Sequence, residues 1–219
     1  ISKAAKEVWQ SKHNKEFALD VFQTGSGTSS NMNANEVIAN VATKSSGVKI
    51  DPNDDVNMSQ SSNDVIPTAI KVSAHMDLSQ KLFPTLDKLI ATIDKKATSL
   101  KGIVKTGRTH LMDAMPIDFS QELSGWKAQL TSVKKSLKAA SNRMLELPQG
   151  GTAIGTGINT HKDFSKHFCN EVNSLSGLKT KQAKNFSQGL SSVDNAAELS
   201  SAVKNLSVAL MKITNELRG

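Results

Sequence analysis

The sequence is poor in cysteine, in aromatic residues and in long apolar runs. Cys169 is the only cysteine, so a disulfide framework is impossible and a reducing compartment is expected. Aromatic residues make up 4% of the chain and tyrosine is absent, which favours a helical core of aliphatic side chains over a sheet. No apolar run could span a bilayer and no signal peptide is recognisable. We therefore predict a cytoplasmic protein without membrane contact, or a protein of the mitochondrial matrix if the source is eukaryotic.

The net charge of +7 comes from 27 basic and 20 acidic residues. Nucleic-acid-binding surfaces combine clustered basic residues with aromatic platforms, whereas the lysines here are scattered. We interpret them as solvated helix faces and expect no nucleic-acid partner. A hydrophobic content of 37% is enough for a packed core and argues against disorder.

Three segments carry apolar residues at alternating steps of three and four, the period of an amphipathic helix. Their members are Leu82, Leu86, Leu89, Ile93, Ala97 and Leu100; Leu123, Trp126, Leu130, Val133, Leu137, Ala140, Met144 and Leu147; and Ala196, Leu199, Val203, Leu206, Leu210, Ile213 and Leu217. A helix over 118–147 would be about 45 Å long, and helices of that length bury their stripes only against other long helices. The sequence therefore predicts an all-α fold built as a long-helix bundle.

Other signals refine the helical pattern. Asn63-Asp64, Asp118 and Asp194 are good N-cap types and mark expected helix starts. Pro84 predicts a break or kink. Shorter helices are expected over 2–10, 33–44 and 161–175, the last with Cys169 as a buried structural thiol.

Four polar stretches lie between the expected helices, at 24–31, 51–63, 105–117 and 148–161. The last three are longer than the loops of about 2–8 residues that a helical bundle needs, and long loops on a rigid scaffold tend to carry function.

Common nucleotide and metal motifs do not fit these stretches. The first lacks the spacing and the lysine of a P-loop, and GGTAIGTG at 150–157 follows a helical pattern rather than a strand. The five histidines form no HExxH motif or close ligand pair, so no metal and no cofactor are expected.

Binding of a small anion fits better. The stretch TGSGTSSN supplies hydroxyls and backbone N–H groups just before a helix, and SQSSND at 59–64 repeats that arrangement. GRTH at 107–110 adds His110, a candidate for proton transfer near neutral pH.

Four segments together resemble one enzyme family. QTGSGTSSNMNANEVIAN, NDDVNMSQSSNDVIPTA, GRTHLMDAMPI and GGTAIGTGINTH are similar to class II fumarases of the fumarase/aspartase superfamily, in the same order and over the whole chain. The resemblance implies a homotetramer with a helical core, with active sites built from loops of three subunits. It also implies reversible hydration of fumarate to L-malate without a cofactor.

The resemblance assigns roles to particular residues. Substrate binding is implied for Ser26, Gly27, Thr28, Ser61, Ser62, Asn63 and Thr109. His110 is implied as the catalytic histidine that handles the proton of the water or hydroxyl. Asn33 and Glu36 are expected to order the first loop.

The chain also departs from the family pattern. The signature GSSxMPxKxN, which carries the carbon-acid base and a substrate-binding lysine, is absent from the 219 residues. We therefore expect a central fragment that is inactive alone, with the end of an N-terminal domain at 1–50, a truncated central bundle at 51–219, and no C-terminal domain. Asp51 stands where the family usually has histidine, so a secondary dicarboxylate site at Asp51, Asn53 and Asp54 is doubtful.

Two alternatives stay open at this point. An aspartate ammonia-lyase-like enzyme belongs to the same superfamily, but typically has glutamine where His110 stands and threonine where Ser62 stands. A non-catalytic helical scaffold, similar to a lens crystallin, would keep the fold without needing His110 or the two serines.

Overall fold

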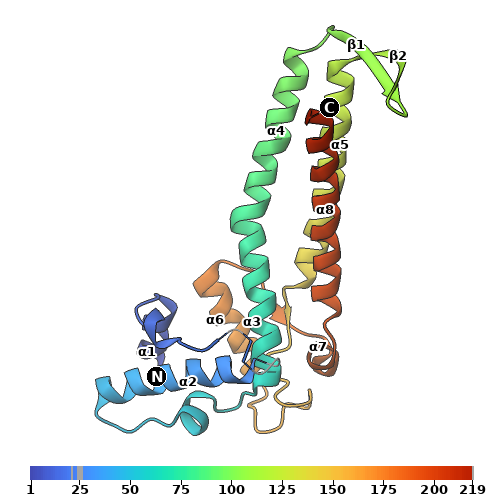
Figure 1. Cartoon of the computed structure of the whole chain (residues 1–219). Coiled ribbons are helices and arrows are strands. Elements are labelled where there is room, and N and C mark those ends of the chain that lie inside the picture. Colours follow the sequence, from blue (N-terminus) through green and yellow to red (C-terminus); the bar gives the residue numbers. More distant parts are fainter. Residues whose placement is uncertain (21, 24–26, 219) are drawn as a thin grey trace. The chain divides into compact units, whose positions relative to one another are not determined.

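The chain is described from a computed structural model that defines residues 1–20, 22–23 and 27–218. It divides into two compact units (Figure 1). Unit 1 consists of Ile1–Val72 and Leu145–Val193, and unit 2 of Ser73–Met144 and Asp194–Gly219. Helices dominate both, which confirms the predicted all-α fold class. The predicted domain division at residue 50 concerns a whole family subunit and stays a prediction.

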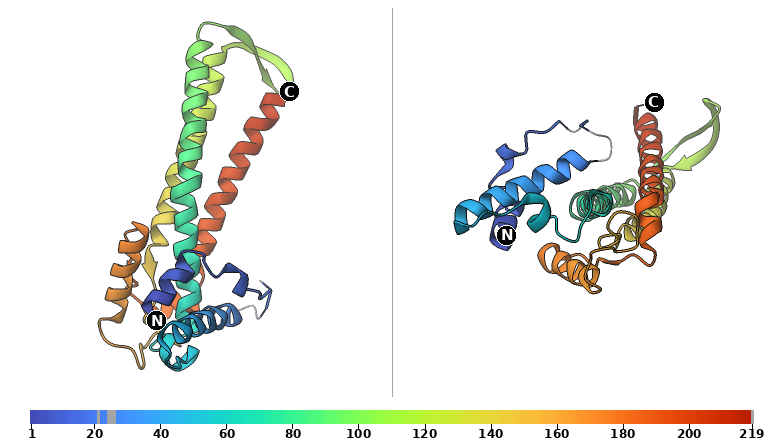
Figure 2. Two further views of the ribbon diagram at one scale, coloured as in Figure 1. Left: turned by 90° about the vertical axis from the view of Figure 1, so that its left-hand side faces the viewer. Right: turned by 90° about the horizontal axis from the view of Figure 1, so that it is seen from below.

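Unit 2 is built on three long helices, α4 (Phe83–Ser99), α5 (Phe119–Arg143) and α8 (Asp194–Arg218). Helix α5 packs against both α4 and α8, and all three run side by side in Figure 2. Their apolar stripes meet in one core, which includes Leu86, Ile93, Ala97, Leu123, Trp126, Leu130, Leu137, Ala140, Leu199, Leu206 and Ile213. The long-helix bundle predicted from the stripes is thus confirmed.

Polar contacts fix the antiparallel register of these helices. Lys127 of α5 pairs with Asp94 of α4, and Lys134 pairs with Asp87. The later residue of α5 thus meets the earlier residue of α4, as in an antiparallel pair. Helix α5 begins with a capping box in which Asp118 accepts from the Ser120 N–H at 2.6 Å.

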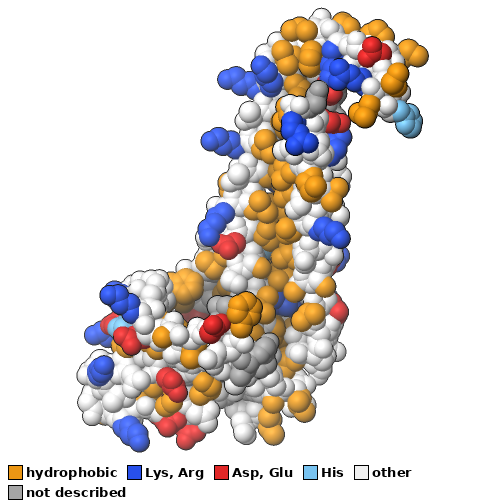
Figure 3. All heavy atoms as spheres, viewed as in Figure 1, with side chains coloured by type: hydrophobic (Ala, Val, Ile, Leu, Met, Phe, Trp, Pro, Cys, Tyr) orange, Lys and Arg blue, Asp and Glu red, His pale blue; other side chains and the backbone are white. Residues whose placement is uncertain are grey.

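Parts of the predicted stripes are wrong. Leu89, Val203 and Leu217 are exposed, and Ala202 and Ala209 are buried in α8 instead. The reason in α8 is that this helix packs chiefly on α5, so its buried face is narrow. At Ala202 and Ala209 this face lies one residue before the predicted stripe positions. Figure 3 shows apolar side chains gathered along the bundle between α4 and α8.

The expected interruption near Pro84 takes the form of a π-helical segment. Helix α3 (Ser62–Asp77) passes into η3 (Leu78–Leu82) and then into α4, whose first turn contains Pro84. Proline has no N–H to donate to the carbonyl four residues earlier, which favours a local change of hydrogen-bond pattern.

The polar stretch 105–117 is an antiparallel hairpin, so the prediction of a loop there is wrong. Strand β1 (Val104–Thr109) pairs with β2 (Met112–Asp118) through a two-residue turn at His110-Leu111. The strand sequences alternate poorly between apolar and polar residues, because both faces of the hairpin are largely exposed in this chain.

Unit 1 holds the remaining helices and short strands. Its elements are α1 (Ser2–Trp9), η1 (Asn14–Glu16), α2 (Thr28–Ser46), η2 (Pro52–Val56), the first part of α3, β3 (Glu146–Leu147), α6 (Phe164–Ser176), β4 (Lys181–Gln182) and α7 (Phe186–Ser191).

Several element boundaries differ from expectation. The helix predicted to run to residue 147 ends at Arg143, and Leu147 instead pairs with Gln182 in a short parallel ladder. Helix α2 begins at Thr28, so the last four residues of the predicted loop 24–31 are helical. Cys169 is buried in α6, as predicted, and burial raises the pKa of its thiol. No described helix is long and apolar enough to cross a membrane.

Candidate active site

A polar cavity of about 430 Å³ lies in unit 1, where two of the predicted functional stretches meet. One wall comes from η2 and the residues that follow it, and the other from the glycine-rich stretch after β3. Its lining residues are Asn53, Asp54, Asn57, Met58, Ser59, Gln60, Ser61, Thr152, Ala153, Ile158 and Asn159. Most of these side chains are neutral hydrogen-bonding groups, which suits an anionic ligand that accepts hydrogen bonds.

Ser61 caps helix α3, two residues before the expected start at Asn63-Asp64. The Ser61 hydroxyl accepts from the Asn63 N–H at 3.2 Å, and the Asp64 carboxylate accepts from the Ser61 N–H at 3.0 Å. This is the reciprocal arrangement of a capping box. It places Ser61, Ser62 and Asn63 at the positive end of the helix dipole.

Asp64 has a second role that the sequence did not reveal. Its side chain is completely buried, and Oδ2 accepts from the backbone N–H groups of Gly150 at 3.0 Å and Thr152 at 2.8 Å. Burial raises the pKa of the Asp64 carboxyl, and the N–H groups of Ser61, Gly150 and Thr152 counteract part of that rise. The carboxylate therefore holds the glycine-rich stretch against the start of α3.

Three further hydrogen bonds join the same two stretches. Asn63 Nδ2 donates to the Ala153 carbonyl at 2.9 Å, and Ser59 Oγ donates to the Asn159 carbonyl at 2.9 Å. The Thr160 hydroxyl donates to the Ser59 carbonyl at 3.0 Å. These bonds hold the two walls of the cavity together, although the loops that form them are about 90–100 positions apart in sequence.

The glycines of this stretch serve close packing. A Cβ atom at Gly155 would lie 2.4 Å from Ser187 Oγ of α7, and one at Gly151 would lie 2.9 Å from Leu190 Cδ1. A side chain at either position would force the neighbouring atoms to shift. Gly151 and Gly155 therefore allow the close contact of this stretch with α7.

The first predicted stretch reaches the same region through α2. Ser26 lies outside the described residues. Gly27 adopts a left-handed conformation before α2, and a Cβ atom there would lie 2.8 Å from Ile66 Cδ1 of α3. Thr28 opens the helix, and Asn31 of the same first turn donates to Ser62 Oγ at 2.9 Å. The structure therefore joins the first stretch to the serine pair.

The residues of the doubtful secondary site separate into two groups. Asn53 and Asp54 line the cavity. Asp51 instead caps η2, accepting from the N–H groups of Asn53 at 2.8 Å and Asp54 at 2.9 Å. The Asp54 N–H, followed by that of Asn53, lowers the pKa of the exposed Asp51 carboxyl. Asp51 therefore has a local structural role in this chain.

Thr109 and His110 belong to unit 2. His110 and Leu111 form the turn of the hairpin, with φ values of 50° and 63°. This turn normally requires asparagine or glycine, and strain of this kind is concentrated at functional sites. Within unit 2 the hairpin joins α4 to α5, so the 25 residues of α5, about 37 Å, separate it from Met144.

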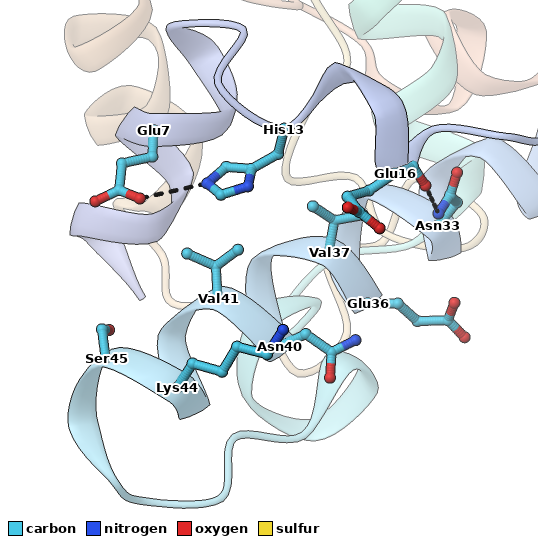
Figure 4. A pocket seen from close by; sticks show the side chains of 10 residues that line it. All are labelled: Glu7, His13, Glu16, Asn33, Glu36, Val37, Asn40, Val41, Lys44 and Ser45. Atoms are coloured by element: carbon cyan, nitrogen blue, oxygen red, sulfur yellow. Dashed lines mark hydrogen bonds and ion pairs between the residues drawn. The ribbon is translucent and has the colours of Figure 1, made fainter.

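A second cavity in unit 1, of about 750 Å³, lies between η1 and α2 (Figure 4). His13 Nε2 and Glu7 Oε2 are 3.3 Å apart on one side, and Asn33 Nδ2 donates to the Glu16 carbonyl at 3.3 Å on another. Asn33 therefore ties the N-terminal segment to α2. Among the described residues, no group of three histidine, cysteine or acidic side chains could hold a metal ion.

Sequence reasoning missed the roles of Asp64 and Thr152 and of the buried amides Asn31 and Asn35. The two asparagines are 5% and 7% exposed and share the face of α2 that carries Ala39 and Ala42. Asparagines that fall on the apolar face of a predicted helix could have indicated a buried polar network. Nothing local in the sequence indicates the burial of Asp64, because its partners are remote.

Comparison with known proteins gives a consistent result. A sequence model of the family described as Lyase matches residues 1–219. The class II fumarate hydratase of Xylella fastidiosa is 49% identical over 218 residues, which are 100% of this chain and 46% of that protein. The corresponding enzyme of Bacillus subtilis is 45% identical over 223 residues and is covered to 48%.

Solved structures agree. The class II fumarase of Schistosoma mansoni has a TM-score of 0.94 at 36% identity, covering 98% of this chain and 49% of that one. The chain thus spans about half the length of the relatives it matches. The resemblance to class II fumarases is confirmed, and the chain belongs to the lyase family.

Proposed function

We propose that this chain supplies part of the active site of a fumarate hydratase, which converts fumarate reversibly to L-malate. The observation that carries the proposal is the pair Ser61-Ser62 at the start of α3. It stands beside a cavity lined mostly by neutral hydrogen-bonding side chains and is held there by the buried carboxylate of Asp64. Identity of 49% to a class II fumarate hydratase supports it.

The chemistry explains why neutral donors are required. In the malate direction a base removes a proton from the carbon next to a carboxylate, and negative charge grows on that carboxylate before hydroxide leaves. Preorganised hydroxyl, amide and N–H donors stabilise this charge most where it is largest. We assign this function to Ser61, Ser62 and Asn63, with Gly27 and Thr28 beside them and Ser26 from the undescribed segment.

We further propose that His110 handles the proton of the water or hydroxyl, with Thr109 as a substrate contact. Both lie on a hairpin whose apolar side chains are exposed in this chain, with Leu111, Met112 and Met115 at 93%, 70% and 80%. Exposed apolar patches mark interaction sites. This supports a homotetramer in which the hairpin meets residues 61–63 of another subunit.

The chain alone is expected to be inactive, because the family's GSSxMPxKxN signature is not among its 219 residues. The absence of a cofactor and a cytoplasmic location stay predictions.

The test uses a chimera in which these 219 residues replace the matching segment of a class II relative. Loss of the ultraviolet absorbance of fumarate, with malate appearing and without added ammonia, is the expected result. Turnover that requires ammonia would instead support the aspartate ammonia-lyase alternative. An inactive chimera of normal assembly, beside an active parent, would count against the proposal.

A further inference from the structure

A cluster of three asparagines, two of them buried, connects α2 to the serine pair. Asn31 and Asn35 lie one turn apart on α2, and Asn57 precedes α3. Asn57 Oδ1 accepts from Asn35 Nδ2 at 3.0 Å and from Asn31 Nδ2 at 3.4 Å. Asn31 Nδ2 also donates to Ser62 Oγ at 2.9 Å.

The direction of every hydrogen bond in this cluster follows from one fixed acceptor. The Gln60 carbonyl can only accept, so Asn57 must turn its NH₂ group toward it, at 3.4 Å. Asn57 Oδ1 then faces α2, and both α2 amides must present NH₂ groups to it. The second hydrogen of the Asn31 NH₂ is left for Ser62 Oγ. The amide orientations are therefore determined by the network.

This order determines what the Ser62 hydroxyl can do. A hydroxyl has one proton to donate, and here its oxygen already accepts from Asn31. Within the described parts of the chain no acceptor is found for the Ser62 proton, and the side chain is half-buried. The Ser61 hydroxyl oxygen is likewise already an acceptor, because it accepts from the Asn63 N–H at 3.2 Å. Both hydroxyls thus keep their protons for a ligand that accepts hydrogen bonds.

We propose that Asn31 is a positioning residue that keeps the Ser62 hydroxyl a donor toward a substrate carboxylate. This inference rests on the proposed function, since it concerns the same serine pair. It adds a residue that touches no substrate and acts through Ser62. It also gives the site a preference for ionised carboxylates over groups that donate hydrogen bonds.

The test compares Asn31→Asp with Asn35→Asp in the active chimera. Both changes place the same charge at a buried position of α2 and remove a donor to Asn57 Oδ1. Only Asn31→Asp gives Ser62 an acceptor, which would take its proton away from the substrate. We expect the KM for fumarate to rise at least about tenfold for Asn31→Asp, and to stay within about twofold for Asn35→Asp.

The pair Asn31→Ala and Asn35→Ala serves if a buried carboxylate prevents folding. Asn31→Ala frees the Ser62 hydroxyl to rotate, so its KM for fumarate is expected to rise above that of the unmodified chimera, while the KM of Asn35→Ala stays within about twofold. Equal effects at positions 31 and 35, or no effect at 31, would overturn the inference and leave the proposed function intact.

If the chimera does not hydrate fumarate, the proposed function fails and a titration decides the inference. Succinate is added to the assembled chimera, and the amide resonances of residues 61–64 are followed by NMR. Shifts that Asn31→Asp weakens and Asn35→Asp does not would uphold the role of Asn31. An absence of shifts in the unmodified chimera would overturn it.

Discussion

The Thr152 backbone N–H donates to the buried carboxylate of Asp64 at 2.8 Å, although 88 positions separate the two residues. With the Gly150 N–H on the same oxygen, this contact attaches the glycine-rich stretch to the helix start that carries Ser61 and Ser62. The geometry of the proposed site therefore depends on a residue outside the substrate contacts.

Replacing Asp64 with asparagine should destabilise unit 1. One oxygen of Asp64 accepts from Ser61 and the other from Gly150 and Thr152, so whichever way an asparagine turns, its NH₂ group faces N–H donors. We expect a loss of about 2 kcal/mol in the free energy of unfolding, measured by urea denaturation. Asp51→Asn is the control, because both N–H donors of Asp51 face one oxygen, which an asparagine retains, and asparagine also caps helices well. Equal shifts in the two midpoints would contradict the role of Asp64.

Replacing Gly155 with alanine should be more harmful than the same change at Gly47. Both glycines have positive φ, but a Cβ atom at Gly155 would lie 2.6 Å from the Ser187 nitrogen, whereas nothing lies within 4 Å at Gly47. Overpacking adds about 1–3 kcal/mol to the backbone strain that both variants share. The difference between their urea midpoints measures that steric part, and a difference near zero would show that α7 moves away freely.

The hairpin turn should become more stable when Leu111 is replaced by asparagine. Leu111 has φ = 63° and is 93% exposed, so the change relieves left-handed strain and removes no packing within the chain. A gain below about 1 kcal/mol is expected, read from slower amide hydrogen exchange in β1 and β2. Leu111→Val should have the opposite effect, since a β-branched residue tolerates positive φ least.

Acid should weaken the junction of β3 and β4 through Glu146. The hydrogen bond from Lys181 holds the pKa of Glu146 below its ordinary value of 4.5. Because the Glu146 pKa is lower in the folded than in the unfolded state, the unfolded state binds the proton first as the pH falls below about 4.5. The stabilisation from Glu146 is therefore complete above that pH and is lost as the pH falls through the folded pKa.

Urea midpoints recorded between about pH 3 and pH 6 test this expectation. Glu146→Gln should reduce the fall of the urea midpoint on the acid side of the pH profile. Lys181→Met should reduce it similarly, because it removes the main cause of the lowered Glu146 pKa. A profile that neither variant changes would assign the acid sensitivity to other carboxylates.

The long helices were predictable because their stripes are local patterns that repeat over many residues. Helix α5 starts after Asp118 as its cap indicated, and Leu130 and Leu137 are completely buried. The hairpin was missed because its strands have no buried face within the chain. Their sequences therefore lack the alternation of apolar and polar residues that predicts a strand. The site motifs were recognisable, but the contacts that organise them were not. Asp64 finds its donors, and Asn31 its serine, only after remote segments come together.

The division of unit 1 between Ile1–Val72 and Leu145–Val193 has a consequence for folding during synthesis. Helices α4 and α5 are neighbours along the chain and can pair as soon as residue 143 has left the ribosome. The Asp64 carboxylate stays solvated until Gly150 and Thr152 have been synthesised and can donate their N–H groups to it. Contacts this distant in sequence form slowly. The nascent chain should therefore assemble the α4–α5 hairpin first, and its ligand-binding loops should be among the last parts to acquire order.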